Sequence, residues 1–512
     1  MSTLKELKDS IFGIDPAAQA IEFEDSWWSW GDLDRIGAGI EAALQQYGLG
    51  VDTRMAGIMR NCPEIAGALA HVLTSDRCLV TLNPSLPDER LASDIAELRT
   101  PVLFGTGKDL ARPEVAHAAS ELGCLVLTLT GDRENPVAVS RGAALTADGF
   151  RLKADPGVAI EMLTSGTTGT PKRIPLQQRT VQDSLLNAAV YENRGGTGPS
   201  LRKAVAIVNA PFAHIAGIFG LMNALIAGRK VALLAKFTVE GWAGAVARHR
   251  PKVAGAPPAA LRMILDANVP REALTSLSAF RTGTAPLDPD LADLFFERYG
   301  IPVLQNYSAT EFAGSGAGWT LADFREFGRT KRGSVGRVSP PTEARIVDGD
   351  SGEPLPADQT GLLALRAPHL GDGSWVRTTD LAMLDADGFL WIKGRADNAI
   401  IRGGFKVFPE DIIRALEAHP AILEVAVIAW PDERLGQVPV AAYMTRSDVQ
   451  PPSEAVLRAY LRDQLLSYQV PVRLFHLAEL PRTPSLKVSQ PELRALLTKP
   501  MQEAQVAGRA TA

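Results

Sequence analysis

Nine consecutive residues at positions 164–172 have the side chains that a polyphosphate-binding loop needs. Glycine lets backbone N–H groups approach phosphate oxygens closely, hydroxyl groups donate further hydrogen bonds, and a lysine adds positive charge. The apolar run Val158 to Leu163 before them predicts a buried strand, and residues 177–190 after them predict a helix. The residue order of a Walker loop is missing, so we predict a phosphate loop of another kind, with a plain polar surface loop as the alternative. The loop consists of Thr164, Ser165, Gly166, Thr167, Thr168, Gly169, Thr170, Pro171 and Lys172.

Strands and helices are predicted to alternate on both sides of this loop. Such alternation favours a parallel sheet covered by helices on both faces, and we expect two α/β lobes of similar composition. In open sheets of this kind the ligand site lies at the carboxyl ends of the strands. The other predicted strands are Met55 to Met59, Cys78 to Leu82, Val102 to Phe104, Cys124 to Leu129, Ala204 to Val208, Val231 to Leu234, Lys252 to Gly255, Ala279 to Thr282 and Val303 to Gln305.

From about Arg337 the pattern changes to short apolar pieces between Asp, Gly and Pro residues, which predicts a small antiparallel sheet or barrel. A separate α+β domain of about 100 residues is predicted after it, with helices at Pro409 to Glu417 and Ser453 to Leu465. The polar tail from about Lys499 is predicted to be frayed. The predicted fold class is α/β, with a large N-terminal domain of two α/β lobes and a small β-barrel, followed by an α+β C-terminal domain.

The bulk properties argue against several classes of protein. The 512 residues carry a formal net charge of −5, and no basic run predicts binding to nucleic acid. The longest apolar run, Ile215 to Ala227, is too short to span a bilayer, and the acidic N-terminus is unlike a signal peptide. We therefore predict a soluble, cytoplasmic protein, and a homodimer is compatible with the sequence. The cysteines do not have the spacing of a metal or redox site; they are Cys62, Cys78 and Cys124.

The loop at 164–172 resembles the phosphate loop of the adenylate-forming superfamily, which includes acyl- and aryl-CoA synthetases, luciferases and the adenylation domains of peptide synthetases. Further motifs of this family follow in the same order along nearly the whole chain. The resemblance implies that ATP and Mg2+ bind, and that a mobile C-terminal domain swings on a hinge at Asp397. The implied divisions are an N-terminal adenylation domain at 1–394, a hinge at 395–398, a C-terminal domain at 399–500 and a tail at 501–512.

Two motifs resemble the family's acyl-pocket and adenine-side segments. Residues 209–214 resemble the motif that opens the acyl-pocket helix, so His214 is expected to line or gate that pocket, with a core histidine as the alternative. Residues 282–287 resemble the adenine-side turn, where glycine and small residues let a flat base approach the backbone. The implied adenine contacts are Gly283, Thr284 and Ala285.

Residues 305–311 resemble the next motif of the family. The resemblance implies that Tyr307 offers a stacking face to adenine and that Asn306 pairs with the base edge. It further implies that Thr310 touches phosphate and that Glu311 is an oxygen ligand of Mg2+. A strand end with a solvated carboxylate is the alternative interpretation.

Residues 377–380 resemble the family's ribose motif. The carboxylate of Asp380 suits the two ribose hydroxyl groups because it can accept two hydrogen bonds at once. Thr379 stands where family members usually have glycine, a departure that leaves Asp380 in place. Arg395 is expected near the ribose or the phosphates.

Residues 402–410 resemble the loop that faces the cleft when CoA-forming members make the thioester. The resemblance implies that Gly403, Gly404 and Lys406 contact CoA. A proline before Glu410 is more typical of acyl-CoA synthetases than of peptide-synthetase adenylation domains, so free CoA is the expected acceptor.

Residues 481–488 resemble the last motif of the family, whose lysine reaches the α-phosphate and the attacking carboxylate during adenylation. That lysine is Lys487 here. A mobile ammonium group suits a transition state that carries extra negative charge at phosphorus. Leu486 stands where the family normally has glycine, which bears on the flexibility of the loop.

The implied function is ATP-dependent ligation of a carboxylic acid to CoA, through an acyl-adenylate and with release of pyrophosphate. Two alternatives stay open. The adenylate passes instead to an amine, a carrier-protein thiol or oxygen, or the chain is an adenylate-binding sensor or a degenerate paralogue, which Thr379 and Leu486 would favour. The acid is expected to be a fatty, aryl or alicyclic one, because the candidate pocket residues are mostly small. They are His214, Gly217, Thr284, Ala309 and Gly314, and the implied catalytic residues are Lys487, Lys172, Glu311 and His214.

Overall fold

The computed structural model describes residues 3–142, 150–163, 173–192, 198–309, 314–338, 340–368, 373–432, 434–446 and 449–510, with the backbone alone for 187–192, 309, 314–315 and 503–510. The described chain forms two compact units. Unit 1 consists of the described residues up to position 341 together with those of segment 367–374, and unit 2 consists of 342–366 and the residues from 375 onward. The predicted divisions at 394–398 and 500 stay predictions.

A seven-stranded sheet forms the first part of unit 1, and its strand order is β7-β6-β5-β3-β4-β8-β9. The five central strands are parallel, and the edge strands β7 and β9 are antiparallel to their neighbours. In chain order the strands are β3 (Arg54–Ile58), β4 (Cys78–Leu82), β5 (Val102–Thr106), β6 (Leu125–Leu129), β7 (Val137–Arg141), β8 (Val158–Leu163) and β9 (Arg173–Gln177).

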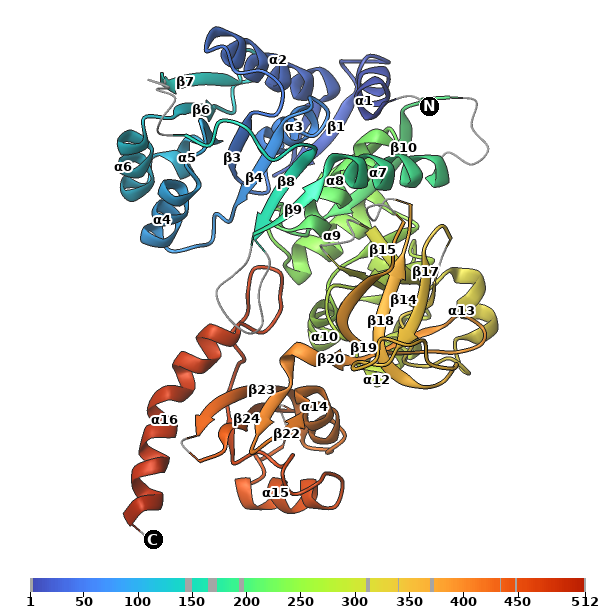
Figure 1. Cartoon of the computed structure of the whole chain (residues 1–512). Coiled ribbons are helices and arrows are strands. Elements are labelled where there is room, and N and C mark those ends of the chain that lie inside the picture. The colour runs from blue at the N-terminus through green and yellow to red at the C-terminus, as the bar shows by residue number, and fades with distance from the viewer. Residues whose placement is uncertain are drawn as a thin grey trace. The chain divides into compact units, whose positions relative to one another are not determined.

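Helices cover both faces of this sheet, as the alternation of strands and helices predicted (Figure 1). Successive strand residues point to opposite faces, so Met55 packs in the cluster of α2 and α3 while Ala56 packs in the cluster of α4 and α6. The helices of this part are α1 (Leu4–Phe12), α2 (Trp30–Gln46), α3 (Pro63–Val72), α4 (Asp88–Leu98), α5 (Gly107–Leu110) and α6 (Pro113–Leu122).

The second part of unit 1 holds two smaller sheets. The first has the order β10-β11-β1-β2, with β1 (Gln19–Phe23), β2 (Ser26–Ser29), β10 (Arg202–Val208) and β11 (Arg229–Leu233). The second has the order β12-β13-β14-β15-β16, with β12 (Val253–Gly255), β13 (Ala279–Thr282), β14 (Val303–Ala309), β15 (Gly314–Gly318) and β16 (Arg337–Val338). The accompanying helices are α7 (Gln178–Glu192), α8 (Ile215–Ile226), α9 (Val239–His249), α10 (Pro258–Asp266), α11 (Arg271–Leu274), α12 (Pro289–Tyr299) and α13 (Leu321–Phe327).

Unit 2 begins with the predicted antiparallel sheet and continues into an α+β part. The sheet is β17 (Glu343–Val347), β18 (Thr360–Arg366), β19 (Val376–Leu384) and β20 (Leu390–Arg395), followed by the short 3-10 helix η2 (Ala396–Asn398). The second sheet has the order β22-β21-β24-β23, with β25 beside β24. Its elements are β21 (Ile400–Arg402), β22 (Phe405–Val407), α14 (Pro409–Glu417), β23 (Ile422–Asp432), β24 (Gly436–Thr445), α15 (Glu454–Arg462) and β25 (Arg473–His476).

The prediction of a frayed tail from about Lys499 is wrong, because α16 (Gln490–Ala510) continues through it. Leu493, Leu497 and Met501 recur every four residues and are buried against the strands β23 and β24, so one face of the helix packs in the core of unit 2. Leu493 and Leu497 precede the tail, and Met501 lies within it. The predicted α/β class with a separate C-terminal domain is confirmed.

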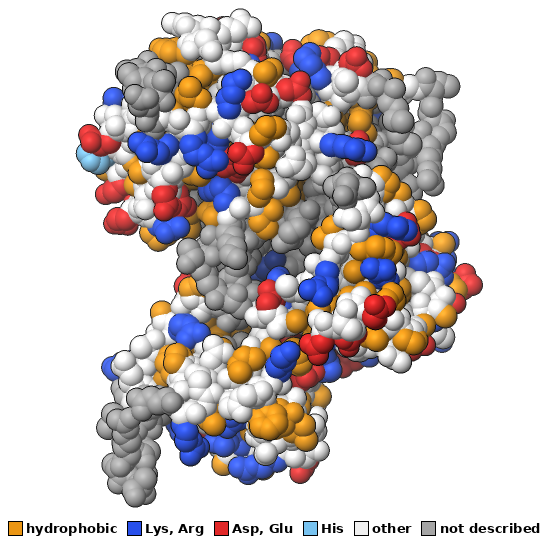
Figure 2. All heavy atoms as spheres, in the orientation of Figure 1, with side chains coloured by type: hydrophobic (Ala, Val, Ile, Leu, Met, Phe, Trp, Pro, Cys, Tyr) orange, Lys and Arg blue, Asp and Glu red, His pale blue; other side chains and the backbone are white. Residues whose placement is uncertain are grey.

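The surface charge and the helix lengths can be compared with the predictions from net charge and from the longest apolar run. Figure 2 shows acidic and basic side chains interspersed on the face of unit 1 that is in view, as the small net charge leads one to expect. Among the described residues, no helix has both the length and the apolar content needed to cross a membrane.

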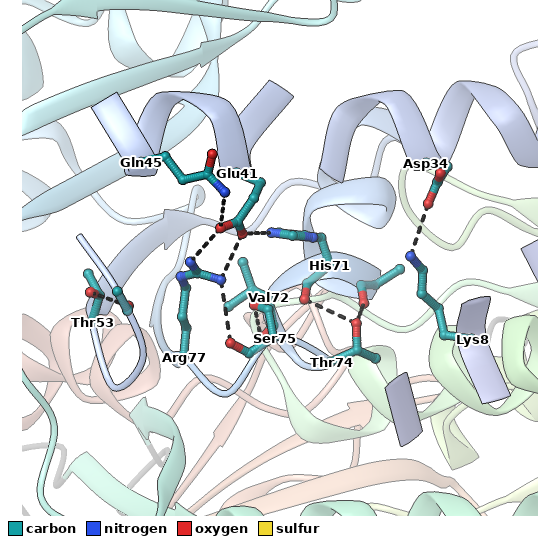
Figure 3. A network of polar contacts seen from close by, with 12 residues as sticks. Lys8, Asp34, Glu41, Gln45, Thr53, His71, Val72, Thr74, Ser75 and Arg77 are labelled. Carbon is teal, nitrogen blue, oxygen red and sulfur yellow. Dashed lines mark hydrogen bonds and ion pairs between the residues drawn. The ribbon is translucent and has the colours of Figure 1, made fainter. Parts of the chain in front are cut away.

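A partly buried polar cluster joins α2, α3 and the turn before β4 (Figure 3). The carboxylate of Glu41 lies 3.3 Å from Nε2 of His71 and 3.0 Å from Nη1 of Arg77. Burial lowers the pKa of His71 to about 4, although the charge of Glu41 opposes this effect. His71 is therefore neutral in the folded protein at pH 7.

The neutral His71 predicts that the protein loses stability on mild acidification. Unfolding returns the imidazole to its ordinary pKa of 6.5, so between pH 6.5 and 4 the unfolded chain binds a proton that the folded chain does not. We expect the free energy of unfolding to fall by about 2–3 kcal/mol over this range from this group alone. Urea unfolding of the wild type and of His71→Gln at pH 7 and 4.5 measures it. An equal loss in both proteins would assign the effect to other groups.

Candidate active site

The predicted phosphate loop, including Lys172, lies outside the described residues, and so do Thr310 and Glu311. The two strands that flank the loop are described. β8 and β9 are antiparallel neighbours, and Leu163 pairs with Arg173 directly across the loop. The prediction of a buried strand before the loop is confirmed, because residues 158–162 are buried.

The predicted adenine-binding residues of unit 1 lie next to one another at the carboxyl ends of two parallel strands. β13 pairs with β14, and Thr282 is the partner of Gln305. A Cβ atom at Gly283 would lie 2.5 Å from Oδ1 of Asn306, so only glycine lets this amide lie against the turn. The sequence motifs at 282–287 and 305–311 therefore meet through Gly283 and Asn306. Tyr307, which follows Asn306, and Ala285, two residues after Gly283, are half-buried.

Thr284, in the same turn, has a φ of +68°. A β-branched residue rarely adopts this left-handed conformation. Strain of this kind persists where the surrounding structure fixes the backbone, and it concentrates at ligand sites. The conformation of Thr284 is thus a second feature that sets this turn apart from an ordinary strand-to-helix connection.

His214 is the residue before the first turn of α8, and its backbone N–H donates to the carbonyl oxygen of Pro211 at 3.0 Å. A Cβ atom at Gly217 would lie 2.2 Å from the same carbonyl oxygen, so the start of α8 packs directly on the turn before it. His214 itself is half-buried, in contrast to the fully buried core histidine of the alternative interpretation.

Asn61 holds the turn before His214, and sequence reasoning missed this role. Its side-chain Nδ2 donates to Ala210 O and Leu234 O at 3.1 Å each, and its Oδ1 accepts from the N–H of Phe212 at 2.8 Å. The residue is 5% exposed, and an amide with this number of buried hydrogen bonds fixes a backbone segment firmly. An asparagine just before a proline-containing helix start is typical of a capping residue, so the sequence offered no signal for the longer-range contact.

In unit 2 the predicted ribose residues share one end of a β-ladder. Asp380 of β19 pairs with Arg395 of β20. The guanidinium of Arg395 donates to both carboxylate oxygens of Asp397, at 2.9 and 2.7 Å, and to the hydroxyl of Thr379 at 2.8 Å. Arg395 outweighs the opposing effect of burial and holds the pKa of Asp397 below its ordinary value. The threonine that departs from the family pattern thus helps to orient Arg395.

Lys487 and Arg395 both belong to unit 2, and the positive charge of Arg395 acts on Lys487. Burial and then the positive charge of Arg395 lower the pKa of Lys487. The lysine sits in a tight hairpin, in which Thr483 N–H donates to Lys487 O and Leu486 N–H donates to Thr483 O, both at 2.8 Å. A desolvated ammonium beside a guanidinium is a strongly positive group, which suits contact with a phosphate.

Leu486 has a φ of +62°, so the residue that replaces the family's glycine adopts a glycine-like conformation. Left-handed backbone costs an L-residue about 1–2 kcal/mol, and glycine commonly occupies this position in such hairpins. We expect Leu486→Gly to raise the free energy of unfolding by up to about 1 kcal/mol, measured by urea unfolding, with adenylation intact. Ser485→Gly is the matched control, because its φ is ordinary, and should not stabilise the protein. A lower free energy of unfolding for Leu486→Gly than for wild type would contradict the conclusion that the backbone of Leu486 is strained.

The predicted CoA loop is a two-residue turn between β21 and β22. Gly403 and Gly404 have φ values of +57° and +90°, which explains why both are glycine. Lys406 and Phe405 follow in β22 and are exposed, and the ring of Phe405 stacks on Tyr468 at 4.7 Å between centroids. The turn presents Lys406 at the surface of unit 2.

Among the described residues, no group of three or more His, Cys, Asp or Glu side chains could hold a metal ion. The predicted Mg2+ ligand, Glu311, lies outside them. A Mg2+ ion that is bound mainly by substrate phosphates and one or two carboxylates needs no such cluster.

The sequence models of two related families match this chain. The model described as AMP-binding enzyme matches residues 14–375, and the model of the AMP-binding enzyme C-terminal domain matches residues 414–487. The chain belongs to the AMP-binding enzymes. The predicted membership of the adenylate-forming superfamily, in its acyl- and aryl-CoA synthetase branch, is thereby confirmed.

Individual relatives of this AMP-binding enzyme span nearly its whole length. It is 27% identical to 4-coumarate–CoA ligase 3 of Oryza sativa subsp. japonica, over 95% of this chain and 90% of the relative. It is 28% identical to indoleacetate–CoA ligase of Aromatoleum aromaticum, over 97% of this chain and 98% of the relative. The crystal structure of ATP-bound MatB from Rhodopseudomonas palustris has the same fold, with a TM-score of 0.79 and 23% identity over 97% and 99% of the two chains. The predicted activity, AMP-forming ligation of a carboxylic acid to CoA, agrees with these CoA ligases.

Proposed function

We propose that this AMP-binding enzyme activates an aromatic or arylalkyl carboxylic acid with ATP and transfers the acyl group to CoA. The two relatives that span the chain are named for 4-coumarate and indoleacetate, which are both acids with an aromatic ring. This supports the aryl class among the fatty, aryl and alicyclic acids that the small candidate pocket residues admit. The observation that supports the adenylation chemistry is the hydrogen-bonded hairpin that holds Lys487, in which Thr483 N–H donates to Lys487 O at 2.8 Å.

The reaction needs two steps because a free carboxylate is a poor acyl donor. In the first step a carboxylate oxygen bonds to the α-phosphorus of ATP, and the bond from that phosphorus to the pyrophosphate oxygen breaks. In the second step the sulfur of CoA bonds to the acyl carbon, the thiol proton is lost, and AMP leaves. The protein's contribution is to position the reactants and to neutralise charge.

In the first step the proposed roles follow the motifs. Thr164 to Gly169 and Lys172 hold the β- and γ-phosphates, and Lys487 neutralises the charge that builds up at the α-phosphate. Asp380 and Arg395 hold the ribose end. Mg2+, bound by Glu311 and by the phosphates, would neutralise the pyrophosphate leaving group. The adenine base would lie on Tyr307, against Asn306, Gly283, Thr284 and Ala285, with Thr310 on a phosphate.

In the second step the proposed roles fall to the other lysine loop. Gly403, Gly404 and Lys406 contact CoA, and the exposed position of Lys406 supports this role. His214 lines the acyl pocket. Its half-buried position before α8 and the tight packing of Gly217 beneath it support this role.

Pyrophosphate release across a panel of acids tests the proposed substrate class. The panel contains 4-coumaric, indoleacetic, decanoic, cyclohexanecarboxylic and malonic acids, each with ATP and Mg2+ and with or without CoA. We expect kcat/KM to be highest for the two aromatic acids, and acyl-CoA to form with them. A preference for decanoic or cyclohexanecarboxylic acid would replace the aryl class by another. If the rate of pyrophosphate release is the same with and without CoA, an amine or a carrier-protein thiol is favoured as the acceptor.

A further inference from the structure

A layer of buried charges lies under α4, beside the two strands that flank the phosphate loop. Arg54 of β3 is completely buried, and its Nε and Nη2 donate to the two carboxylate oxygens of Glu161 at 2.7 Å each. Asp94 of α4 is 3% exposed, and its Oδ2 atom accepts no hydrogen bond from the described residues.

Arg173 is the first residue of β9 and follows Lys172 directly. Its Nη1 donates to the carbonyl oxygens of Glu161 and Thr81, at 3.0 and 3.1 Å. Burial lowers the pKa of Arg173, yet a guanidinium keeps its proton, so a full positive charge lies near Glu161 and Asp94. The guanidinium therefore connects β9 with both β4 and β8.

The two carbonyl groups that Arg173 binds lie where the pairing between β4 and β8 ends. Among the described residues, β4 and β8 form two Cα pairs, Leu79 with Ile160 and Val80 with Glu161. The carbonyls of Thr81 and Glu161 lie at the end of this short ladder, where the guanidinium bonds to both. The side chain of Arg173 thus links β4 to β8 beyond the last backbone pair of the two strands.

We infer that Arg173 is a positioning residue for the adenylation step: it holds β4, β8 and β9 together at the base of the phosphate loop and so fixes the point from which Lys172 extends. The inference rests on the proposed phosphate-binding role of residues 164–172. A lysine could not replace it fully, because the two N–H bonds of Nη1 have fixed directions in the guanidinium plane, whereas those of an ammonium rotate on a flexible stem.

This role predicts a split between the two half-reactions. The β- and γ-phosphates are present only during adenylation, so a displaced loop slows that step and leaves thioester formation from a ready-made acyl-adenylate unaffected. A displacement of about 1 Å can cost 10- to 100-fold in rate. A merely structural role would lower both half-reactions together.

The test compares Arg173→Met, Arg173→Lys and wild type. ATP–pyrophosphate exchange gives kcat/KM for ATP, and thioester formation is followed from synthetic acyl-adenylate and CoA. We expect Arg173→Met to lose about 10- to 100-fold in kcat/KM for ATP, Arg173→Lys to lose less, and thioester formation to stay within about twofold for both. Arg112→Met is the matched control. Arg112 also binds two carbonyl oxygens, of Pro84 and Leu86 at 3.1 and 2.8 Å, and both half-reactions should stay near wild type.

Three outcomes would overturn the inference: unchanged exchange in Arg173→Met, equal losses in both half-reactions, or an equal effect of Arg112→Met on exchange. If Arg173→Met does not fold, Arg173→Lys decides by the same comparison. Failure of the proposed function is a separate result, in which the wild type catalyses no exchange with any acid of the panel. In that case the affinity for MgATP, measured by equilibrium dialysis, decides the inference: Arg173→Lys must bind more weakly than wild type and Arg112→Met must not.

Discussion

Replacement of Lys487 by alanine is expected to lower the rate of acyl-adenylate formation about 100- to 1,000-fold while ATP still binds. The ammonium group acts on charge that develops at the α-phosphorus, so its loss raises the barrier more than it weakens the ground state. Burial and the charge of Arg395 both lower the pKa of Lys487. As the pH rises, Lys487 therefore loses its proton, and the wild-type rate of adenylation should decrease, below the ordinary lysine pKa of 10.5. ATP–pyrophosphate exchange as a function of pH measures both effects.

Lys406→Ala is the matched control for Lys487→Ala, because it removes the lysine of the other loop. It should leave exchange near the wild-type level and slow thioester formation from synthetic acyl-adenylate. A wild-type rate of ATP–pyrophosphate exchange in Lys487→Ala would show that this lysine has no role in the adenylation step. Equal losses in both half-reactions for both variants would contradict the assignment of one lysine loop to each step.

The second large effect is expected on stability, from the buried pair of Arg54 and Glu161. Removal of one partner by Glu161→Ala leaves the completely buried guanidinium of Arg54 without its carboxylate. Breaking a buried ion pair in this way costs about 3–5 kcal/mol. Replacement of both residues by methionine should recover most of this loss, because neither Arg54 nor Glu161 then leaves the charge of its partner unpaired. The midpoints and slopes of urea unfolding measure both variants.

The ionisation of Glu161 gives the same pair a pH signature. Burial disfavours the carboxylate, but the hydrogen bonds and the charge of Arg54 outweigh it and hold the pKa of Glu161 below its ordinary value of 4.5. The stabilisation is therefore fully present above pH 4.5 and is lost as the pH falls through the lower folded pKa.

An exposed ion pair provides the control for this prediction. Glu343 and Arg366 approach to 2.6 Å, but their side chains are 57% and 39% exposed, so Glu343→Ala should cost no more than about 1 kcal/mol. A similar small cost for Glu161→Ala would mean that water or another group compensates Arg54.

The sequence predicted most of the elements of both units because apolar periodicity and turn residues are local signals. The predicted bounds agree with the structure for Cys78 to Leu82, Val158 to Leu163, Ala279 to Thr282 and Pro409 to Glu417. β19, which carries the ribose motif, was not predicted, because Arg377, Thr378, Thr379 and Asp380 are polar and resemble a loop. Its pairing with β18 and β20 overrides this weak local preference.

The motif residues were predictable by their order in the chain, but their supporting contacts were not. Nothing in the sequence links Asn61 to Phe212, or Arg173 to Thr81, because these partners are far apart in the chain and meet only in the fold. Leu486 shows the converse. Its departure from glycine was visible in the sequence, and the structure adds that the backbone there is still left-handed.

Mass spectrometry of the intermediate tests the central claim most directly. The enzyme is incubated with ATP, Mg2+ and the acid of the panel that gives the fastest pyrophosphate release, first without CoA and then with CoA added. We expect acyl-AMP to accumulate in an amount comparable to the enzyme, and to disappear on addition of CoA as acyl-CoA and AMP form. An adenylate that persists with CoA but is consumed by an added amine, or the absence of any adenylate in protein that binds ATP, would contradict the acid–CoA ligase account.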